Sequence, residues 1–345
     1  MGIYVDGGDY MTIMAKPFLN IDMQVQKLID RGLIIESLEE TKRILLKTTY
    51  YDVINGYKDI FLEEKTSADD EDKFLPNTKF NDLLILYKLD KNIRNFIFNS
   101  VLEVECNFYS ALSYCISEKY GEKHDVYLKK ENYKAGKIQA YNRKSERENL
   151  LWKINKKLRD AEEQPLKYYI QKYGNVPPWI LVKSLTFGEL LVLYKLSTAD
   201  IKDNVIKILL GTDPSEEEKE FFVKSMELFN KFRNRAAHGG RMYNYKTNIE
   251  IPYREWLFDI LGITKKQYNS GIGKSDNGAL MLALLNFHKN DAKRLYEFIV
   301  FLNFDIKGYI EKQPIHATNI FKYLGIPFDF YDKVTTCLSY GILKT

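Results

Sequence analysis

The amino-acid sequence predicts an all-α protein, and three stretches support that prediction. Apolar residues recur at helical spacing through residues 79–121, 221–232 and 279–304. The middle stretch carries an aromatic-rich stripe made of Phe221, Phe222, Met226, Phe229 and Phe232. Each stretch is therefore expected to bury one face of a helix against other helices.

The N-terminal elements follow from capping and turn signals. Residues 1–16 read as a loose leader, and a helix is predicted over 20–31, with Asn20 as a capping candidate and Gly32 after its end. A second helix over 36–46, a turn-rich element over 50–61 and an acidic surface loop over 66–73 follow. The pattern of 79–121 exceeds the ordinary length of a helix, which predicts a break near Asn99 or Asn107.

The second half begins where Pro177-Pro178 interrupts the chain. Trp179 and Phe187 are expected to pack, and a helix is expected to begin near Thr186. Residues 213–215 are predicted to cap the helix that carries the aromatic stripe. An extended segment over 247–252, a polar turn over 274–277, a helix over 279–304 and two shorter helices complete the prediction.

Composition excludes several classes of protein. Charged residues are 28% and hydrophobic residues 45% of the 345, which is typical of a soluble globular chain. No apolar run approaches the roughly 20 residues that span a bilayer, and the N-terminus lacks the features of a secretion signal. The three cysteines have no metal-binding spacing, and their odd, sparse count favours a reducing cytoplasm. We therefore expect a cytoplasmic protein.

Positive charge is concentrated in residues 129–172, called the basic segment below. It holds 13 Lys and Arg against six Asp and Glu, although the whole chain has a net charge of only +4. Aromatic residues interleave with the cations: Tyr133, Tyr141, Trp152, Tyr168, Tyr169 and, directly after the segment, Tyr173. Cations that neutralise phosphates and rings that stack on bases would suit single-stranded RNA. A solvated basic helix with its rings in the core explains the pattern equally well.

The candidate chemical site lies at the end of the helix with the aromatic stripe. Asn234 and His238 are four residues apart, so they share one face if the helix continues, whereas Arg233 lies five residues from His238. A long arginine side chain, or a second chain, has to close that gap. Gly239-Gly240 is a natural helix end. Histidine suits proton transfer near neutral pH, and arginine suits a phosphate.

These residues carry a family resemblance. Arg233-Asn234-x-x-x-His238 matches the R-x4-6-H motif of the HEPN superfamily of metal-independent ribonucleases. The longer run RNRAAHGGRMYN is similar to a pattern of the Abi-like (abortive infection, AbiD/AbiF) family. The resemblance implies a HEPN-like helical bundle with additional N- and C-terminal helices, and Arg233, Asn234 and His238 as catalytic residues. No metal or cofactor is expected.

Other stretches carry the same resemblance, which covers about residues 16–335. KPFLNIDMQVQKLIDRGLII near the N-terminus and NVPPWILVKSLTFGELLVLYKLS at 175–197 are both similar to Abi-like sequences. Lys183 departs from the family, where many relatives have an acidic residue. Arg94 and Glu105 are candidates for supporting the catalytic cluster, although charges on a helix usually face water.

The resemblance also implies partners. RNA is the expected substrate, with a structured noncoding RNA as a possible antitoxin, in an abortive-infection or toxin–antitoxin system. Because the chain holds one motif copy and HEPN ribonucleases combine two, we expect a homodimer. The alternatives are a non-catalytic RNA-binding HEPN module and, more remotely, a toxin controlled by a nucleotidyl-modifying protein. The residues expected to bind RNA are Arg235, Arg241, Lys129, Lys130, Arg143, Lys144, Arg147, Lys153, Lys156 and Lys157.

The predicted organisation has five parts. The leader 1–16 precedes an N-terminal helical part over 17–128 and the RNA-contact segment over 129–175. The part with the HEPN motif covers 176–252, and a C-terminal helical extension covers 253–345.

Overall fold

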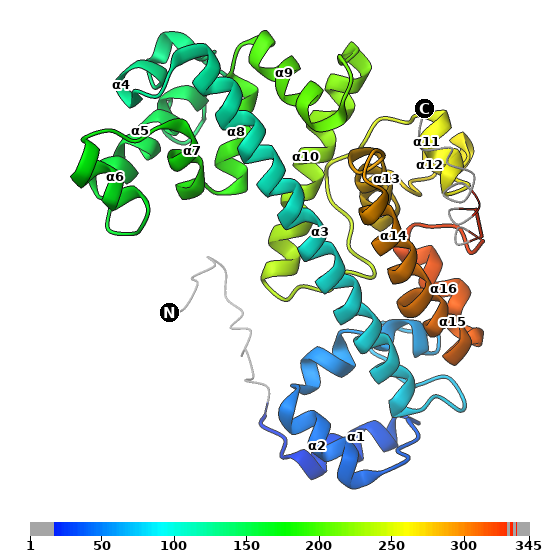
Figure 1. Cartoon of the computed structure of the whole chain (residues 1–345). Coiled ribbons are helices and arrows are strands. Elements are labelled where there is room, and N and C mark those ends of the chain that lie inside the picture. The colour runs from blue at the N-terminus through cyan, green and yellow to red at the C-terminus, as the bar shows by residue number, and fades with distance from the viewer. Residues whose placement is uncertain (1–16, 330–331, 334–335, 337–345) are drawn as a thin grey trace, which may run out of the picture. The chain divides into compact units, whose positions relative to one another are not determined.

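The computed structural model describes residues 17–329, 332–333 and 336, and these residues form helices joined by loops (Figure 1). Extended pairing within the described residues is limited to isolated bridges, so the all-α prediction is confirmed. The predicted leader lies outside the described residues. The chain divides into two compact units, Met1–Tyr87 and Lys88–Thr345. The division falls inside helix α3 (Phe80–Tyr120).

The first unit is built from short helices. They are α1 (Ile21–Asp30), α2 (Leu38–Lys47), the π-helix η1 (Tyr51–Asn55) and the 3-10 helix η2 (Lys58–Phe61). The Asn20 side chain accepts the Met23 N–H at 2.9 Å, so the predicted cap of the first helix is confirmed. Leu28, Val53 and Phe61 form part of its core.

The second unit holds the remaining helices. They are α4 (His124–Tyr127), η3 (Lys130–Asn132), α5 (Glu146–Arg159), α6 (Leu166–Tyr173), α7 (Pro178–Leu181), η4 (Val182–Ser184), α8 (Phe187–Leu196), α9 (Ala199–Leu210), α10 (Glu216–Ala237), α11 (Glu255–Ile260), α12 (Lys265–Asn269), α13 (Asn277–Phe287), α14 (Ala292–Phe301), η5 (Leu302–Lys307), α15 (Gly308–Lys312) and α16 (Pro314–Leu324).

Helix α3 runs without the predicted break. Both Asn99 and Asn107 are exposed, so their amides are solvated and leave the helical hydrogen bonds intact. The apolar stripe stays buried on either side of them, as Ile97, Val101 and Val104 show. Continuous burial along one face therefore holds a helix of 41 residues together.

Aromatic contacts join α3, α8 and α10, which lie together in Figure 1. The Phe108 ring of α3 lies 5.4 Å from the Tyr194 ring of α8 and 6.3 Å from the Phe222 ring of α10. Every member of the predicted stripe on α10 is buried. Ring contacts at these distances add to the free energy gained from burying apolar area. This packing fixes the helix that carries the candidate site.

Two further predictions in this unit are wrong. The helix predicted over 279–304 is two helices, because the Asp291 side chain accepts the N–H groups of Lys293 and Arg294, each at 3.1 Å, and so starts α14 anew. Trp179 does not pack in the core and is 46% exposed, because α7 buries Pro178, Ile180 and Leu181 and leaves Trp179 on its outer side. Phe187 is buried as predicted.

Candidate functional site

Local sequence determines where helix α10 begins and ends. Ser215 and Glu218 form a capping box, in which the Ser215 Oγ accepts the Glu218 N–H and the Glu218 carboxylate accepts the Ser215 N–H. The helix ends at Ala237, and His238 occupies the C-cap position. Gly239 then takes a φ of +70°, which turns the chain away. His238 is therefore exposed at a helix C-terminus.

Arg233 and Asn234 occupy different surroundings one turn earlier. Asn234 is exposed, and its Nδ2 donates to the Asn230 Oδ1 at 3.2 Å. Arg233 is half-buried, with its Nε 3.2 Å from the Glu105 Oε2 and its guanidinium 6.0 Å from the centre of the Phe98 ring. The two charged groups touch without the alignment of a hydrogen bond. The structure therefore brings Glu105 to the motif, as the sequence suggested.

Burial controls the electrostatics of this ion pair. Loss of hydration raises the pKa of the Glu105 carboxyl above its ordinary value, and the neighbouring Arg233 offsets part of that rise. The carboxyl is buried, whereas the Arg233 side chain keeps access to solvent. Glu105 thus holds the guanidinium of Arg233 against α3, whereas the imidazole of His238 is exposed to solvent.

The segment after the motif contains the other two predicted cations. The Arg235 Nε donates to the Arg241 carbonyl oxygen at 3.2 Å, and its guanidinium lies 5.2 Å from the Tyr245 ring centre. This contact folds residues 238–241 back against the helix. Arg241 is partly exposed and Arg235 is exposed. Both cations therefore lie within a few residues of His238.

Sequence reasoning missed Asp90, which binds the same segment from α3. Its carboxylate is fully buried, and its Oδ1 accepts the N–H groups of Met242 at 2.8 Å and Tyr243 at 2.6 Å. Its Oδ2 lies 3.2 Å from the Nη2 of Arg94, the other α3 residue that the sequence singled out. A signal was available, because Asp90 stands four residues after Leu86, on the otherwise apolar stripe of α3.

The predicted RNA-binding residues of the basic segment fall into two groups. Arg147 donates to the carbonyl oxygens of Lys130 and Tyr133, and Lys157 binds the Ser184 carbonyl and the Glu189 carboxylate. These two cations therefore bind groups of the protein itself. The remaining six are exposed: Lys129, Lys130, Arg143, Lys144, Lys153 and Lys156.

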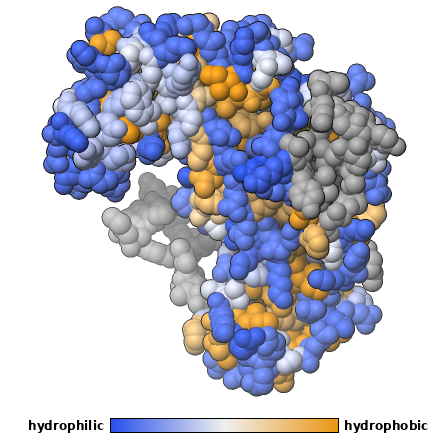
Figure 2. Space-filling model, viewed as in Figure 1, coloured by the Kyte–Doolittle hydropathy of each residue, from blue (hydrophilic) through white to orange (hydrophobic). Residues whose placement is uncertain are grey.

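Most aromatic rings of the basic segment also face solvent. Trp152 of α5 is 57% exposed, with the Lys156 Nζ 5.6 Å from the ring centre. On α6 the Lys172 Nζ lies 5.1 Å from the Tyr168 ring and 5.3 Å from the Tyr173 ring. Tyr133, by contrast, is buried. The visible face of the α4–α6 region is mostly hydrophilic (Figure 2). The rings are thus paired with cations on a polar surface.

A groove of about 470 Å³ lies between α5 and α8. Tyr141 and Lys153 line it on one side and Gly188 on the other. A Cβ placed on Gly188 would lie 3.5 Å from the Asn230 Nδ2, and Asn230 in turn binds Asn234. Gly188 of α8 therefore lies beside the helix that carries the motif.

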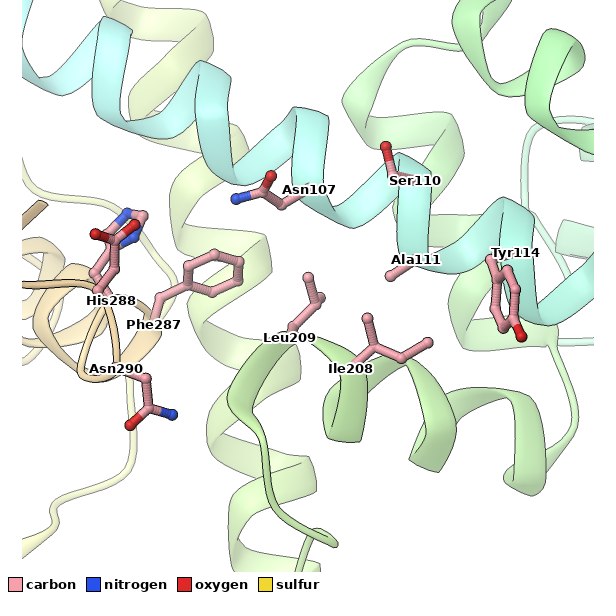
Figure 3. A pocket seen from close by; sticks show the side chains of 10 residues that line it. Asn107, Ser110, Ala111, Tyr114, Ile208, Leu209, Phe287, His288 and Asn290 are labelled. Carbon is pink, nitrogen blue, oxygen red and sulfur yellow. The ribbon is translucent and has the colours of Figure 1, made fainter. Parts of the chain in front are cut away.

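A second groove, of about 760 Å³, lies elsewhere on α3 (Figure 3). Asn107 and Ser110 line it from α3, with Leu209 from α9 and the buried imidazole of His288 beyond α13. Asn107 is two residues after Glu105, about 200° further round the helix. This groove is therefore separate from the motif.

Within residues 17–329, 332–333 and 336, no group of three or more His, Cys, Asp or Glu side chains is arranged to hold a metal ion. Over the same residues, no helix has the length and apolar character that crossing a bilayer requires.

Comparison with known proteins identifies the family. Residues 43–244 match the family model described as "Abi-like protein", which is more than half of the chain. Neither the curated proteins nor the solved structures gave a match. The matched range contains α3, the basic segment and the whole of α10 with the residues that follow it to Asn244. The chain therefore belongs to the Abi-like protein family.

Proposed function

We propose that this protein is a metal-independent endoribonuclease that acts in abortive infection, as part of a toxin–antitoxin type of phage defence. The ribose 2′-oxygen attacks the adjacent phosphorus, and the bond from phosphorus to the 5′-oxygen breaks. A base takes the 2′-hydroxyl proton, and an acid gives a proton to the leaving 5′-oxygen. The products are a 2′,3′-cyclic phosphate and a 5′-hydroxyl.

The observation that carries the proposal is the arrangement at the end of α10. His238 and Asn234 are exposed there, and Arg233, which directly precedes Asn234 on the same helix, has a side chain that is 30% exposed. An exposed imidazole exchanges protons near neutral pH, so it suits either proton transfer. Arginine suits the charge that develops on the phosphorus oxygens. Asn234 orients the imidazole or donates to phosphate.

The exposed rings and cations of the basic segment supply the surface for RNA. Trp152 with Lys156, and Tyr168 and Tyr173 with Lys172, combine stacking faces with positive charge. Such pairs bind single-stranded nucleic acid with little sequence preference. The groove beside Tyr141 and Lys153 gives this surface a recess for the strand. A structured noncoding RNA that controls the toxin would occupy the same surface.

The test is cleavage of an end-labelled RNA by His238→Ala. We expect the variant to lose at least about 100-fold in cleavage rate, because proton transfer by a positioned side chain contributes that much. Its affinity for a 2′-O-methylated oligonucleotide, which cannot be cut, should stay within about twofold of wild type, because the imidazole acts in proton transfer rather than binding. A chelator should leave the wild-type rate unchanged. Ser270→Ala is the matched control, since Ser270 is the exposed C-cap residue of α12.

One observation favours a second function, a non-catalytic RNA-binding module. Because Arg233 is paired with Glu105, its guanidinium is less available to stabilise the charge of a transition state. The motif would then bind phosphate without cleaving RNA. Wild-type protein that binds RNA yet never cuts it would establish this reading. Sequencing RNA that co-purifies with the protein separates the kinds of ligand further. One abundant structured species indicates a dedicated partner, and a random mixture indicates a substrate.

A further inference from the structure

One face of α3 meets the motif along several turns. Asp90, Arg94 and Phe98 follow one another at intervals of four residues, and Glu105 is seven further on, so all four lie on the same side of the helix. Glu105 and Phe98 contact Arg233. Asp90 and Arg94 extend that contact to the segment after His238. The motif therefore packs against a row of α3 side chains, three of them charged, that begins well before α10 in the sequence.

Asp90 fixes the position of this segment. It accepts two backbone N–H groups, from Met242 and Tyr243, and is fully buried. From the opposite direction the buried Asn277 donates its Nδ2 to the Met242 carbonyl oxygen at 2.7 Å. Hydrogen bonds to a charged group are about twice as strong as neutral ones. The peptide at 242–243 is consequently held from two helices.

Arg94 is positioned by the same carboxylate and reaches the motif turn. Its Nη2 lies 3.2 Å from the Asp90 Oδ2, and its Nη1 lies 3.9 Å from the position that a Cβ on Gly239 would take. Gly239 directly follows His238. The Arg94 side chain remains 20% exposed. Its buried Nε has no hydrogen-bond partner among the described residues. Asp90 thus uses part of the guanidinium and leaves donors unused beside the motif.

We infer that Arg94 is a phosphate-binding residue of the candidate site and that Asp90 is its positioning residue. The inference rests on the proposed function, because it takes RNA as the ligand. Glu105 competes with a phosphate for the guanidinium of Arg233. Arg94 supplies a second guanidinium close to Gly239, the residue after His238. Its planar fork can donate to one phosphate oxygen while it stays paired with Asp90. The ligand is the phosphodiester of a single RNA strand.

The experiment measures how salt changes affinity for a 2′-O-methylated oligonucleotide, by fluorescence anisotropy on the full chain. Losing one phosphate contact should lower the slope of log K against log salt by about 0.7 for a single strand. We expect Arg94→Gln to show that loss and about tenfold weaker binding at moderate salt, because a charge-assisted hydrogen bond disappears. Arg94→Lys should keep the slope and lose part of the affinity, since it retains charge without the fork.

Arg43→Gln is the matched control, because Arg43 is an exposed arginine of α2 paired with Glu40. It should change neither the slope nor the affinity. Asp90→Asn tests positioning. If Asp90 acts through Arg94, Asp90→Asn weakens binding in the wild type and adds nothing in the Arg94→Gln background. If Asp90→Asn acted only by removing one negative charge, the variant would bind the oligonucleotide more tightly than wild type. That result would overturn the role of Asp90.

Circular dichroism and thermal melting establish that each variant is folded. If Arg94→Gln lowers the melting temperature but leaves slope and affinity unchanged, the pair is structural and the inference fails while the proposed function stands. Should Arg94→Gln not fold, the slope and affinity of Arg94→Lys decide: wild-type affinity would overturn the inference. Wild-type protein that does not bind RNA at all would overturn both.

Discussion

The two chemical groups of the motif differ in how freely they can meet a ligand. His238 stands exposed at the C-cap of α10, whereas the guanidinium of Arg233 is held by Glu105 against Phe98. A phosphate that binds Arg233 must compete with the Glu105 carboxylate, because both are anions that use the same donors. Glu105 is therefore the residue whose removal should affect ligand binding most directly.

We expect Glu105→Gln to bind RNA a few-fold more tightly, because a negative charge next to the phosphate-binding arginine is removed. Thermal stability should change little, because the cost of burying the Glu105 carboxylate offsets its attraction to Arg233, and Arg233 keeps access to solvent. Anisotropy with the uncleavable oligonucleotide measures the affinity. Weaker binding by the variant would mean that Glu105 orients Arg233 for the ligand instead of competing with it.

Asp276 makes stability depend on pH. Its carboxyl is buried at the start of α13, and burial raises its pKa from 3.8 to about 6, although the N–H groups of Ala279 and Gly273 oppose the rise. Between about pH 4 and 6 the folded state binds a proton that the unfolded state does not. The stability that comes from protonating Asp276 is therefore fully present below about pH 4 and is lost as the pH rises through about 6.

Asp276→Asn should abolish that component. The difference in unfolding free energy between pH 4.5 and pH 7, measured by urea titration, should differ between variant and wild type by about 2–3 kcal/mol. Other acidic groups titrate equally in both proteins, so the comparison cancels their effect. Parallel pH profiles for the two proteins would contradict the prediction.

At the scale of elements, helices whose periodicity and caps agree were predicted well. Helix α10 starts directly after its N-cap, Ser215, and ends before Gly239-Gly240, because both ends are specified by adjacent residues. The break expected in α3 is absent, and the break between α13 and α14 was not expected. Both errors have one cause, since an Asn or Asp interrupts a helix only where its side chain binds nearby backbone instead of water.

Gly325 and Gly174 provide a matched test of a close contact between elements. Both are left-handed C-cap residues, with φ of +72° for Gly325 and +61° for Gly174. A Cβ on Gly174 meets nothing within 4 Å, whereas one on Gly325 would collide with the Asp276 carboxylate. We expect Gly174→Ala to cost about 1 kcal/mol of unfolding free energy and Gly325→Ala about 3 kcal/mol. Equal losses in urea titration would show that the backbone there relaxes freely.

At the scale of the whole molecule, the single motif copy raises the question of assembly. If two protomers share one cleft, a mixture of Arg233→Ala and His238→Ala chains forms heterodimers that keep one intact arginine and one intact histidine. The mixture should then cleave RNA well above the sum of the separate variants. Light scattering should report twice the mass of one chain. Additive activity, or cleavage by a monomer at micromolar concentration, would contradict a shared cleft.

The sequence by itself determined the all-α class, the caps at Asn20 and Ser215 and the helix end before Gly239-Gly240, because each depends on spacing within a few turns of chain. Only the tertiary structure decided which charges meet. Arg147 and Lys157 could not be told from the exposed cations around them until the fold gave them carbonyl and carboxylate partners. Glu105 likewise pairs with Arg233, and Asp90 binds the peptide at 242–243, across separations of more than a hundred residues. Those pairings depend on which face of α3 packs against α10, and local spacing does not contain that information.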